Sequence, residues 1–447
     1  MSTKSNPKEK KIMFKKTKVF LALALALTLC FANIPAVFAA QPTGTESAPA
    51  QAAITKLLMV PHGTAVPSTT FKFTVTPVSI DGNPSAKPPV QGIGSDGTVS
   101  LIFPPSAYYT LEETIDDTDY YYLETEELFG GVNFEHAGVY VYEIEEAGNT
   151  FTNEGTPPVA PYEKMDFSLA KYTVEVYVKD GEYGTYIYFI GAVRTVNDDD
   201  TYADVKVDPT PGEESEDFDY SQMIFTNTYV KANGGTDPQE PDNAALSVSK
   251  QVLGEFASKT IYFIYDMKVF TPSLIGAAET YTAYVVEDDP MNPGKYRVVT
   301  TDANFSGTIG MDGSIRFPSD TLVTFNLRAN QYLVFIDTPV GVHYEIAEKG
   351  TAGYIPSVVV TYDGTPGGDE IGDKGAGLVL PHNANYFYKD TLYVGEGANS
   401  ADFLNENDTT TPTGLDLNDL PFIGMIILAI GAAVAFIVVK VRKRKTD

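Results

Sequence analysis

The sequence predicts an all-β protein made of two tandem β-sandwich domains. Several segments alternate β-branched or aromatic residues with polar ones, which is typical of strands: 70–76, 139–144, 172–178 and 186–190. Asp-Gly pairs begin at positions 81, 96, 180, 312 and 363 and predict tight turns. No helical period appears between the two apolar termini, so we expect short strands joined by turns, as in sandwiches.

A Gly-, Pro- and Asp-rich linker divides the chain. Residues 231–245 read KANGGTDPQEPDNAA, which predicts a boundary between a first strand-rich unit at 52–230 and a second at 246–407. Residues 40–51 are small and polar and predict a flexible leader. The external part has about 370 residues, enough for two domains of ordinary size.

The N-terminus predicts a secretory signal peptide at residues 1–39. Seven lysines precede an apolar stretch from Val19 to Phe38, and small residues around Ala39 suit signal-peptidase cleavage. The single cysteine, Cys30, lies inside this segment, so the mature chain has none. Disulfides therefore cannot reinforce its domains, and any covalent reinforcement needs other chemistry.

The C-terminus predicts a membrane anchor. Residues 408–421 hold a Pro-Thr-Gly motif and a short spacer, and residues 422–439 are an apolar run just long enough to cross a bilayer as a helix. The basic residues of 440–447 should remain in the cytoplasm by the positive-inside rule. We therefore expect everything before the motif to lie outside the cell.

The external part is strongly acidic. Residues 40–414 hold 19 Lys+Arg and 55 Asp+Glu, a net charge of about −36. Phosphate backbones and anionic lipid headgroups repel such a surface. Nucleic acid is therefore excluded as a partner, and the expected contact with the membrane is through the C-terminal helix.

Two predicted strands place a lysine on their apolar face. Because side chains alternate along a strand, Lys56 shares a face with Ile54 and Leu58, and Lys250 falls on the apolar face of the segment 246–252. A lone lysine of this kind is more often a long side chain that snorkels from the edge of a core. The recurrence of the pattern in both units argues against that simpler interpretation.

Each unit also contains an inward-facing glutamate and asparagine. Glu146 and Glu348 each end an alternating apolar segment, and Asn227 and Asn405 each lie beside aromatic residues near the end of their unit. The order Lys, Glu, Asn thus occurs twice at similar spacing. This repetition predicts one fold used twice, with differences in the loops.

The three polar groups make physical sense only in contact. Separate burial of an amine, a carboxyl and an amide costs far more than burial as one hydrogen-bonded set. An apolar pocket lowers the pKa of a lysine and raises that of a glutamic acid, so both groups can be neutral. The neutral amine is then a nucleophile, and a protonated carboxyl bonded to the asparagine carbonyl would polarise it and carry protons as ammonia leaves. Because the fold holds the groups together, a Lys–Asn amide can form without an external enzyme.

The C-terminal motif resembles the cell-wall sorting signal of Gram-positive surface proteins, in which a Pro-Thr-Gly motif precedes an apolar helix and a basic tail. This resemblance implies that a sortase cleaves after Thr413, between Pro412-Thr413 and Gly414, and joins the threonine carbonyl to an amine of peptidoglycan or of a neighbouring pilin subunit. The common signal has one more residue between Pro and Thr, and the shortened form is similar to that of several streptococcal backbone pilins. A plain single-pass tail with an accidental Pro-Thr-Gly turn is the alternative.

The segments that contain the Lys, Glu and Asn residues of each unit resemble two domain families. The segments 140–146 (YVYEIEE) and 225–229 (FTNTY) are similar to the streptococcal pilin isopeptide-linkage domain, and the segments 248–250, 344–348 and 403–405 are similar to collagen-adhesin B-type domains. Both resemblances imply immunoglobulin-like sandwiches that contain a Lys–Asn isopeptide bond.

Carried onto this chain, the resemblance pairs Lys56 with Asn227, assisted by Glu146, and Lys250 with Asn405, assisted by Glu348. The neighbouring acids compete only weakly for the assisting role, because alternation places them on the opposite faces of their strands: Glu145 and Glu345.

The expected function is that of a structural protein at the cell surface, a sortase-anchored pilin or pilus-like stalk subunit. Lys206 and Lys231 are candidates for the lysine that accepts Thr413 of the next subunit. A monomeric wall-anchored adhesin, which binds a host or microbial surface ligand, is the alternative.

Enzymatic and metal-dependent functions have little support. The four histidines are scattered, and the chain has neither a Gly-x-Ser-x-Gly elbow nor a histidine-based metal motif. The acidic stretches 116–119, 197–200 and 213–219 could bind calcium but lack the spacing of an EF-hand. We therefore expect no enzymatic activity on other molecules, no cofactor and no metal.

Overall fold

The computed structural model describes residues 43–103, 113–115, 117–147, 151–156, 159–212, 220–232, 237–275, 279–300, 309–380 and 392–407. The predicted signal peptide, sorting motif, transmembrane helix and basic tail lie outside these residues. No helix of the described part is long and apolar enough to cross a membrane. The described chain is almost entirely β, with only short 3-10 helices such as η3 (Pro241–Asn243) and η4 (Ser273–Ile275), which confirms the predicted fold class.

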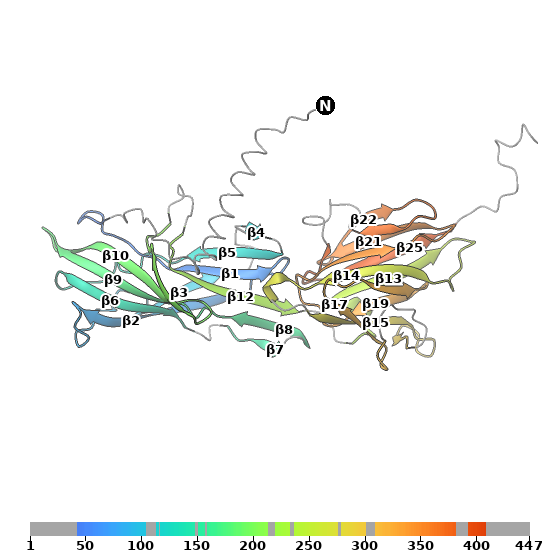
Figure 1. Cartoon of the computed structure of the whole chain (residues 1–447), viewed down its shortest axis with the longest axis horizontal. Coiled ribbons are helices and arrows are strands. Elements are labelled where there is room, and N and C mark those ends of the chain that lie inside the picture. Colours follow the sequence, from blue (N-terminus) through green and yellow to red (C-terminus); the bar gives the residue numbers. More distant parts are fainter. Residues whose placement is uncertain are drawn as a thin grey trace, which may run out of the picture.

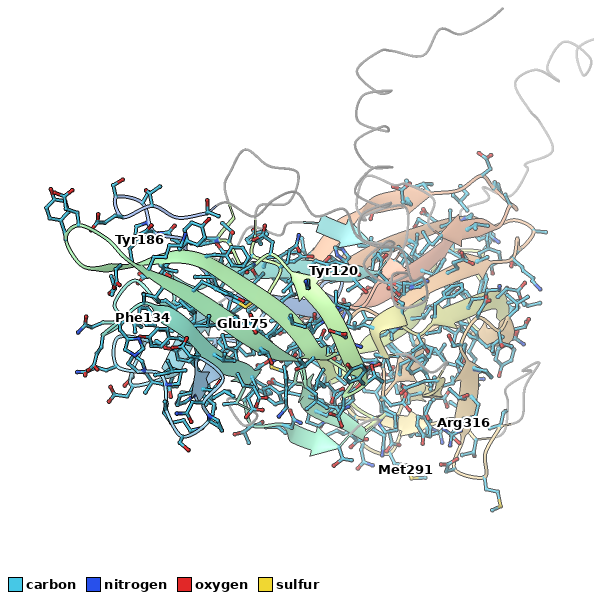
Figure 2. The ribbon with its side chains drawn as sticks, turned by 60° about the vertical axis from the view of Figure 1, so that its left-hand side comes forward. Tyr120, Phe134, Glu175, Tyr186, Met291 and Arg316 are labelled. Atoms are coloured by element: carbon cyan, nitrogen blue, oxygen red, sulfur yellow. The ribbon has the colours of Figure 1, made fainter. Side chains whose placement is uncertain are left out.

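The first domain is a sandwich of two sheets (Figure 1). One sheet has the order β4 (Glu113–Ile115), β5 (Thr118–Glu124), β1 (Thr55–Pro61), β12 (Ile224–Ala232), β8 (Val159–Asp166) and β7 (Glu154–Thr156). The other has the order β11 (Tyr202–Val207), β10 (Thr185–Val196), β9 (Lys171–Asp180), β6 (Gly138–Glu146), β2 (Thr69–Ile80) and β3 (Thr98–Phe103). Figure 2 brings the second sheet forward, with Glu175 on β9 and Tyr186 on β10.

The second domain is also a two-sheet sandwich. The larger sheet has the order β16 (Tyr296–Val298), β15 (Thr280–Asp288), β19 (Gln331–Phe335), β13 (Leu246–Leu253), β25 (Ser400–Glu406), β21 (Ile355–Tyr362) and β22 (Thr365–Ile371), with β17 (Ser314–Pro318) paired to β15. The smaller sheet has the order β18 (Val323–Leu327), β14 (Phe263–Phe270), β20 (His343–Glu348) and β23 (Leu378–Leu380), with β24 (Leu392–Tyr393) paired to β20.

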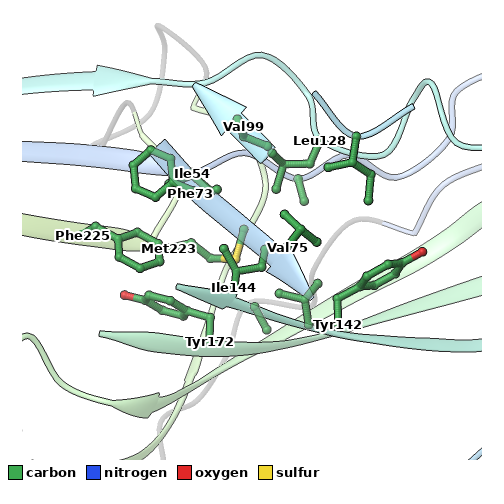
Figure 3. Close-up of a cluster of buried hydrophobic side chains, with 14 of the residues drawn as sticks. Ile54, Phe73, Val75, Val99, Leu128, Tyr142, Ile144, Tyr172, Met223 and Phe225 are labelled. Carbon is green, nitrogen blue, oxygen red and sulfur yellow. The ribbon is translucent and has the colours of Figure 1, made fainter. Parts of the chain in front are cut away.

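Each sandwich buries its own apolar core. In the first domain, alternate residues of the facing strands meet between the sheets, among them Phe73, Ile144, Tyr172 and Phe225 (Figure 3). A separate cluster fills the second domain. Burial of alternate side chains is what the sequence pattern predicts for strands that have one face toward a core.

The predicted Asp-Gly turns lie at strand ends. Asp363 and Gly364 connect β21 to β22, and both have positive φ (48° and 76°), as a two-residue type I′ hairpin requires. Asp81 and Gly82 also have positive φ (49° and 74°) directly after β2.

The two domains lie end to end and touch (Figure 1). The Lys231 ammonium at the end of β12 lies 2.9 Å from a Glu396 carboxylate oxygen of the second domain. The Val340 N–H donates to the Lys231 carbonyl at 2.8 Å. The Ser273 N–H of η4 also donates to Asp117 at 2.8 Å. Several polar contacts therefore connect the two sandwiches at the joint.

Candidate functional site

The first buried triad joins strands of both sheets of the first domain. Lys56 lies on β1, Asn227 on β12 and Glu146 on β6. The Lys56 Nζ lies 2.7 Å from Glu146 Oε2, and Asn227 Nδ2 donates to Glu146 Oε1 at 2.9 Å. Lys56 and Asn227 are fully buried, and Glu146 is 8% exposed. One carboxyl group thus contacts both the amine and the amide nitrogen.

The second triad has the same arrangement. Lys250 lies on β13, Asn405 on β25 and Glu348 on β20. The Lys250 Nζ lies 2.9 Å from Glu348 Oε2, and Asn405 Nδ2 donates to Glu348 Oε1 at 2.5 Å. All three side chains are at most 2% exposed. In both domains one oxygen of the carboxyl contacts the lysine and the other contacts the asparagine.

The register of the strands is repeated as well. β1 and β12 are neighbouring parallel strands in which Lys56 pairs with Phe225, two residues before Asn227. β13 and β25 are also neighbouring parallel strands, in which Lys250 pairs with Phe403, two residues before Asn405. Side chains two residues apart point to the same face of a strand, so each lysine and asparagine face the same core.

The glutamates come from the opposite sheets. Glu146 pairs with Phe73 of β2, and Glu348 pairs with Tyr265 of β14. In each domain the second strand therefore positions the acid across the sandwich from the first and last strands. The triad spans the two layers of the sandwich.

Burial changes the protonation of these groups. Removal from water lowers the pKa of Lys56 to about 8, although the carboxylate of Glu146 opposes this shift. Burial also raises the pKa of Glu146 above its ordinary value, against the opposing effect of Lys56. In the second domain, burial lowers the pKa of Lys250 to about 8. Neutral amines therefore become accessible near physiological pH, as nucleophilic attack requires.

Aromatic rings enclose both amines. The Lys56 Nζ lies 4.7 Å from the centre of the Phe71 ring, and the Lys250 Nζ lies 4.2 Å from that of Phe263. Behind the first triad, the Phe225 ring packs against Phe73 and Tyr172 at 5.0 and 5.1 Å (Figure 3). These rings exclude water, which strengthens the electrostatic contacts inside the triad.

One expected contact is wrong in the structure. From the sequence we expect the carboxyl to contact the asparagine carbonyl, whereas in both domains it contacts the amide nitrogen instead. In the first domain the carbonyl oxygen, Asn227 Oδ1, accepts a hydrogen bond from the backbone N–H of Ser168 at 2.7 Å. A backbone N–H can only donate, so this contact requires the oxygen at that position and fixes the orientation of the amide.

Two neighbours of the triads, Ser168 and Tyr265, are not predicted from the sequence. Ser168 lies between β8 and β9, and no local pattern marks that position. The Tyr265 hydroxyl donates to Glu348 Oε2 at 3.2 Å. Alternation along β14 could have identified Tyr265 as buried, but its pairing with Glu348 depends on strand register.

The other residues predicted from the sequence are the competing acids, the sorting motif and the candidate acceptor lysines. Glu145 and Glu345 do face away from the cores, and Glu145 forms an exposed ion pair with Lys171. Pro412, Thr413 and Gly414 lie outside the described residues. Lys206 is exposed on the edge strand β11, while Lys231 lies at the domain joint.

The acidic stretches do not form a metal centre in the described part of the chain, where no cluster of three or more ligating side chains is found. Asp117 contacts Ser273 and Asp119 contacts His62. Asp198 accepts hydrogen bonds from Ser168 and Thr226. Residues 213–219 lie outside the described residues.

Comparison with protein families gives a match for each domain. Residues 52–230 match the Spy0128-like isopeptide containing domain. Residues 244–376 match a domain of unknown function, DUF7601. The likeness of the second domain to collagen-adhesin B-type domains remains a prediction from its motifs. No curated protein matches the chain.

Solved structures with a similar chain include pilus proteins. The major pilin from Streptococcus pyogenes is 18% identical, with 80% of this chain and 99% of that chain covered and a TM-score of 0.29. A major pilin of another Streptococcus pyogenes serotype is 16% identical, with 80% and 98% covered and a TM-score of 0.29. A pilus-presented adhesin is 8% identical, with 79% and 100% covered and a TM-score of 0.20.

Proposed function

We propose that this chain, whose first domain is a Spy0128-like isopeptide domain of pilin type, is a structural cell-surface protein that acts as a pilin or pilus-like stalk subunit. In this proposal each domain is locked by one intramolecular amide, Lys56–Asn227 and Lys250–Asn405. Glu146 and Glu348 assist the formation of these bonds, and a sortase joins Thr413 to the wall or to the next subunit.

The repetition of the buried triad carries the proposal. A lysine, a glutamate and an asparagine meet in both domains at the same strand register, and in each domain one carboxyl group contacts both the amine and the amide nitrogen. A single such set could be a buried polar network. Two sets with the same geometry support the formation of a Lys–Asn amide in each domain, because buried ionisable groups are costly to retain without a use.

The bond would suit a protein that bears tension. In each domain the lysine and the asparagine lie on neighbouring parallel strands, the first and the last of the domain. A covalent link between these strands carries force past the rest of the sandwich, so the domain body does not unravel. The mature chain has no cysteine, and an amide also survives reducing conditions.

Of the two candidate acceptor lysines, the geometry favours Lys206. Lys231 is held between Glu396 and Glu163 at 2.9 and 3.4 Å. Partial burial disfavours its charge, but the hydrogen bonds and charges of the two glutamates outweigh this effect and raise its pKa. An acceptor must attack as a neutral amine, and the exposed Lys206 forms no ion pair of this kind with the residues that the structure describes.

Expression of the full chain in a Gram-positive host that carries a pilin sortase tests the proposal. We expect wall extracts to contain a ladder of covalent polymers, which Thr413→Ala and Lys206→Arg abolish and the control Lys231→Arg retains. A single wall-linked band from the wild type would instead support the monomeric adhesin. A ladder that persists in Thr413→Ala would contradict the sortase route.

A further inference from the structure

We propose that the backbone N–H of Ser168 is an oxyanion donor for the Lys56–Asn227 bond, and that Asp198 is the residue that positions it. This inference rests on the proposed bond-forming function of the first triad. The Ser168 N–H would stabilise the reaction intermediate in the first domain, and the described residues of the second domain show no equivalent donor.

The donor lies at the reacting carbonyl. The Ser168 N–H is 2.7 Å (N to O) from Asn227 Oδ1, within the range of donors that stabilise oxyanions. Ser168 is 3% exposed and Asn227 is fully buried, so water does not compete for this oxygen. The amide nitrogen on the other side of the group contacts Glu146. The carbonyl and the leaving group of Asn227 therefore have separate, dedicated partners.

The proposed step conserves atoms and protons. The neutral Lys56 Nζ attacks Asn227 Cγ, a C–N bond forms, and the carbonyl electron pair moves onto Oδ1, where the Ser168 N–H stabilises the new charge. Glu146 Oε2 accepts a proton from Nζ, and the carboxyl delivers a proton through Oε1 to Nδ2. The Cγ–Nδ2 bond then breaks, ammonia leaves, and the electron pair returns to restore the carbonyl of the new amide.

Asp198 holds the donor against the asparagine strand. Its Oδ1 accepts hydrogen bonds from Ser168 Oγ at 2.5 Å and from the Thr226 N–H at 2.9 Å. Thr226 directly precedes Asn227 on β12. The Leu169 N–H also donates to the Asp198 carbonyl at 3.1 Å. One aspartate thus ties the Ser168 segment to the strand that carries the reacting amide.

The second domain shows no equivalent of this donor in its described residues. Asn405 Oδ1 is buried and has no hydrogen-bond partner there. The acid of that triad instead gains the Tyr265 hydroxyl, which donates to Glu348 Oε2. Because removal of one oxyanion donor typically costs about 10²–10³ in rate, we expect the first bond to form faster than the second.

The test measures both bonds in the same molecules. The full chain is synthesised during a short pulse of cell-free translation in the presence of detergent. Samples are quenched in acidic denaturant at successive times and then digested with a protease. Mass spectrometry then quantifies the linked peptide pairs of Lys56–Asn227 and Lys250–Asn405. The second bond serves as the internal reference for synthesis and quenching.

We expect Asp198→Ala to slow the first bond by about 10- to 100-fold, because a donor misplaced by 1 Å can cost about that much, while the second bond keeps its rate. Asp198→Asn keeps an acceptor oxygen for Ser168 and Thr226 and should restore a rate near that of the wild type. Asp81→Ala is the matched control, since Asp81 Oδ1 also accepts a backbone N–H, that of Val139, between segments of the first domain. This control should leave both rates unchanged.

Ser168→Ala provides a second route if Asp198→Ala does not fold. It keeps the donor N–H but removes the Oγ contact to Asp198, and it should slow the first bond alone. An unchanged rate of the first bond in the folded variants, or equal slowing of both bonds, would overturn the inference. Absence of both linked peptides in the wild type would instead refute the bond-forming function on which the inference rests.

Discussion

At the residue scale, the pairing of a buried lysine with a buried glutamate would determine the conditions under which the proposed bond can form. The proposed reaction needs an uncharged Lys56 beside a protonated Glu146. This neutral pair holds the same number of protons as the ion pair formed by a charged Lys56 and an ionised Glu146. Burial brings the two states closer in free energy, because it lowers the pKa of Lys56 to about 8 and raises that of Glu146. The apolar walls of the core thereby favour the neutral forms that the proposed reaction needs.

This proton count predicts the pH dependence of the first bond. Above about pH 8 the pair loses its last shared proton, Glu146 cannot protonate the leaving ammonia, and the rate should fall. Below the raised pKa of Glu146 a second proton keeps Lys56 charged, and the rate should fall again. Pulse-synthesised chain diluted into buffers of different pH, followed by quantification of the linked peptide, gives the profile. A rate that keeps rising well above pH 8 would mean that the acid is not needed as a proton donor.

The residues of both triads could be predicted because alternation in a strand assigns each side chain to a face. A Lys, Glu or Asn among apolar neighbours of the same face is therefore visible in the sequence. Ser168 and Asp198 could not be found in this way. Their roles depend on the path of two loops and on a backbone N–H, and no side-chain pattern encodes either.

At the element scale, the parallel pairing of the first and last strands is the feature that gives the proposed bonds their effect. Neither β1 with β12 nor β13 with β25 is joined by a hairpin, so most of each domain lies between the paired strands in sequence. A link between them closes a loop of roughly 170 residues in the first domain, and such a constraint stabilises mainly by restricting the unfolded chain.

Asn227→Ala should therefore destabilise the first domain strongly. Loss of the link is expected to lower its free energy of unfolding by about 5 kcal/mol. For a domain of this size that corresponds to a fall of about 10–20 °C in Tm. Calorimetry should show the second domain unfolding at its wild-type temperature.

A double-variant comparison separates the link from the loss of the side chain. Glu146→Gln is also expected to prevent linkage, so Asn227→Ala added to that background should cost only about 1–3 kcal/mol, the usual cost of buried hydrogen bonds. If Asn227→Ala lowered the free energy of unfolding by the full amount of about 5 kcal/mol in the Glu146→Gln background as well, a covalent contribution would be contradicted.

The strands themselves were largely predictable, since segments such as 172–178 combine alternation with β-branched and aromatic residues and form β9. The neighbours of each strand in the sheets were not. Pairing between strands far apart in sequence depends on packing of the whole sandwich, and the repeated Lys–Phe register became visible only in three dimensions.

At the scale of the whole molecule, the joint between the domains decides whether a stalk would be stiff. Lys231 connects Glu163 of the first domain with Glu396 of the second, and the Glu396 carboxylate also accepts the Ala65 N–H at 2.8 Å. The linker composition predicted a boundary near this point but no contacts across it. Contacts between loops of two domains are not encoded by local composition.

Lys231→Ala should loosen this joint. It leaves two glutamates near each other without their shared cation, so we expect a broader distribution of interdomain angles in small-angle X-ray scattering. The effect on stability should be small, because the ion pair is partly exposed and screened. Lys164→Ala, which removes an exposed ion pair with Asp166 within β8, is the matched control. An unchanged scattering profile in Lys231→Ala would show that the remaining contacts hold the joint alone.

The most direct test of the central claim is the intact mass of a protein that comprises residues 40–411, beside its Lys56→Ala and Lys250→Ala variants. We predict that the wild type is lighter than its sequence by two ammonia molecules, and that each variant, after correction for its substitution, is lighter by one. A wild-type mass equal to that of the sequence would contradict the account, because both triads would then be hydrogen-bonded networks without a covalent bond.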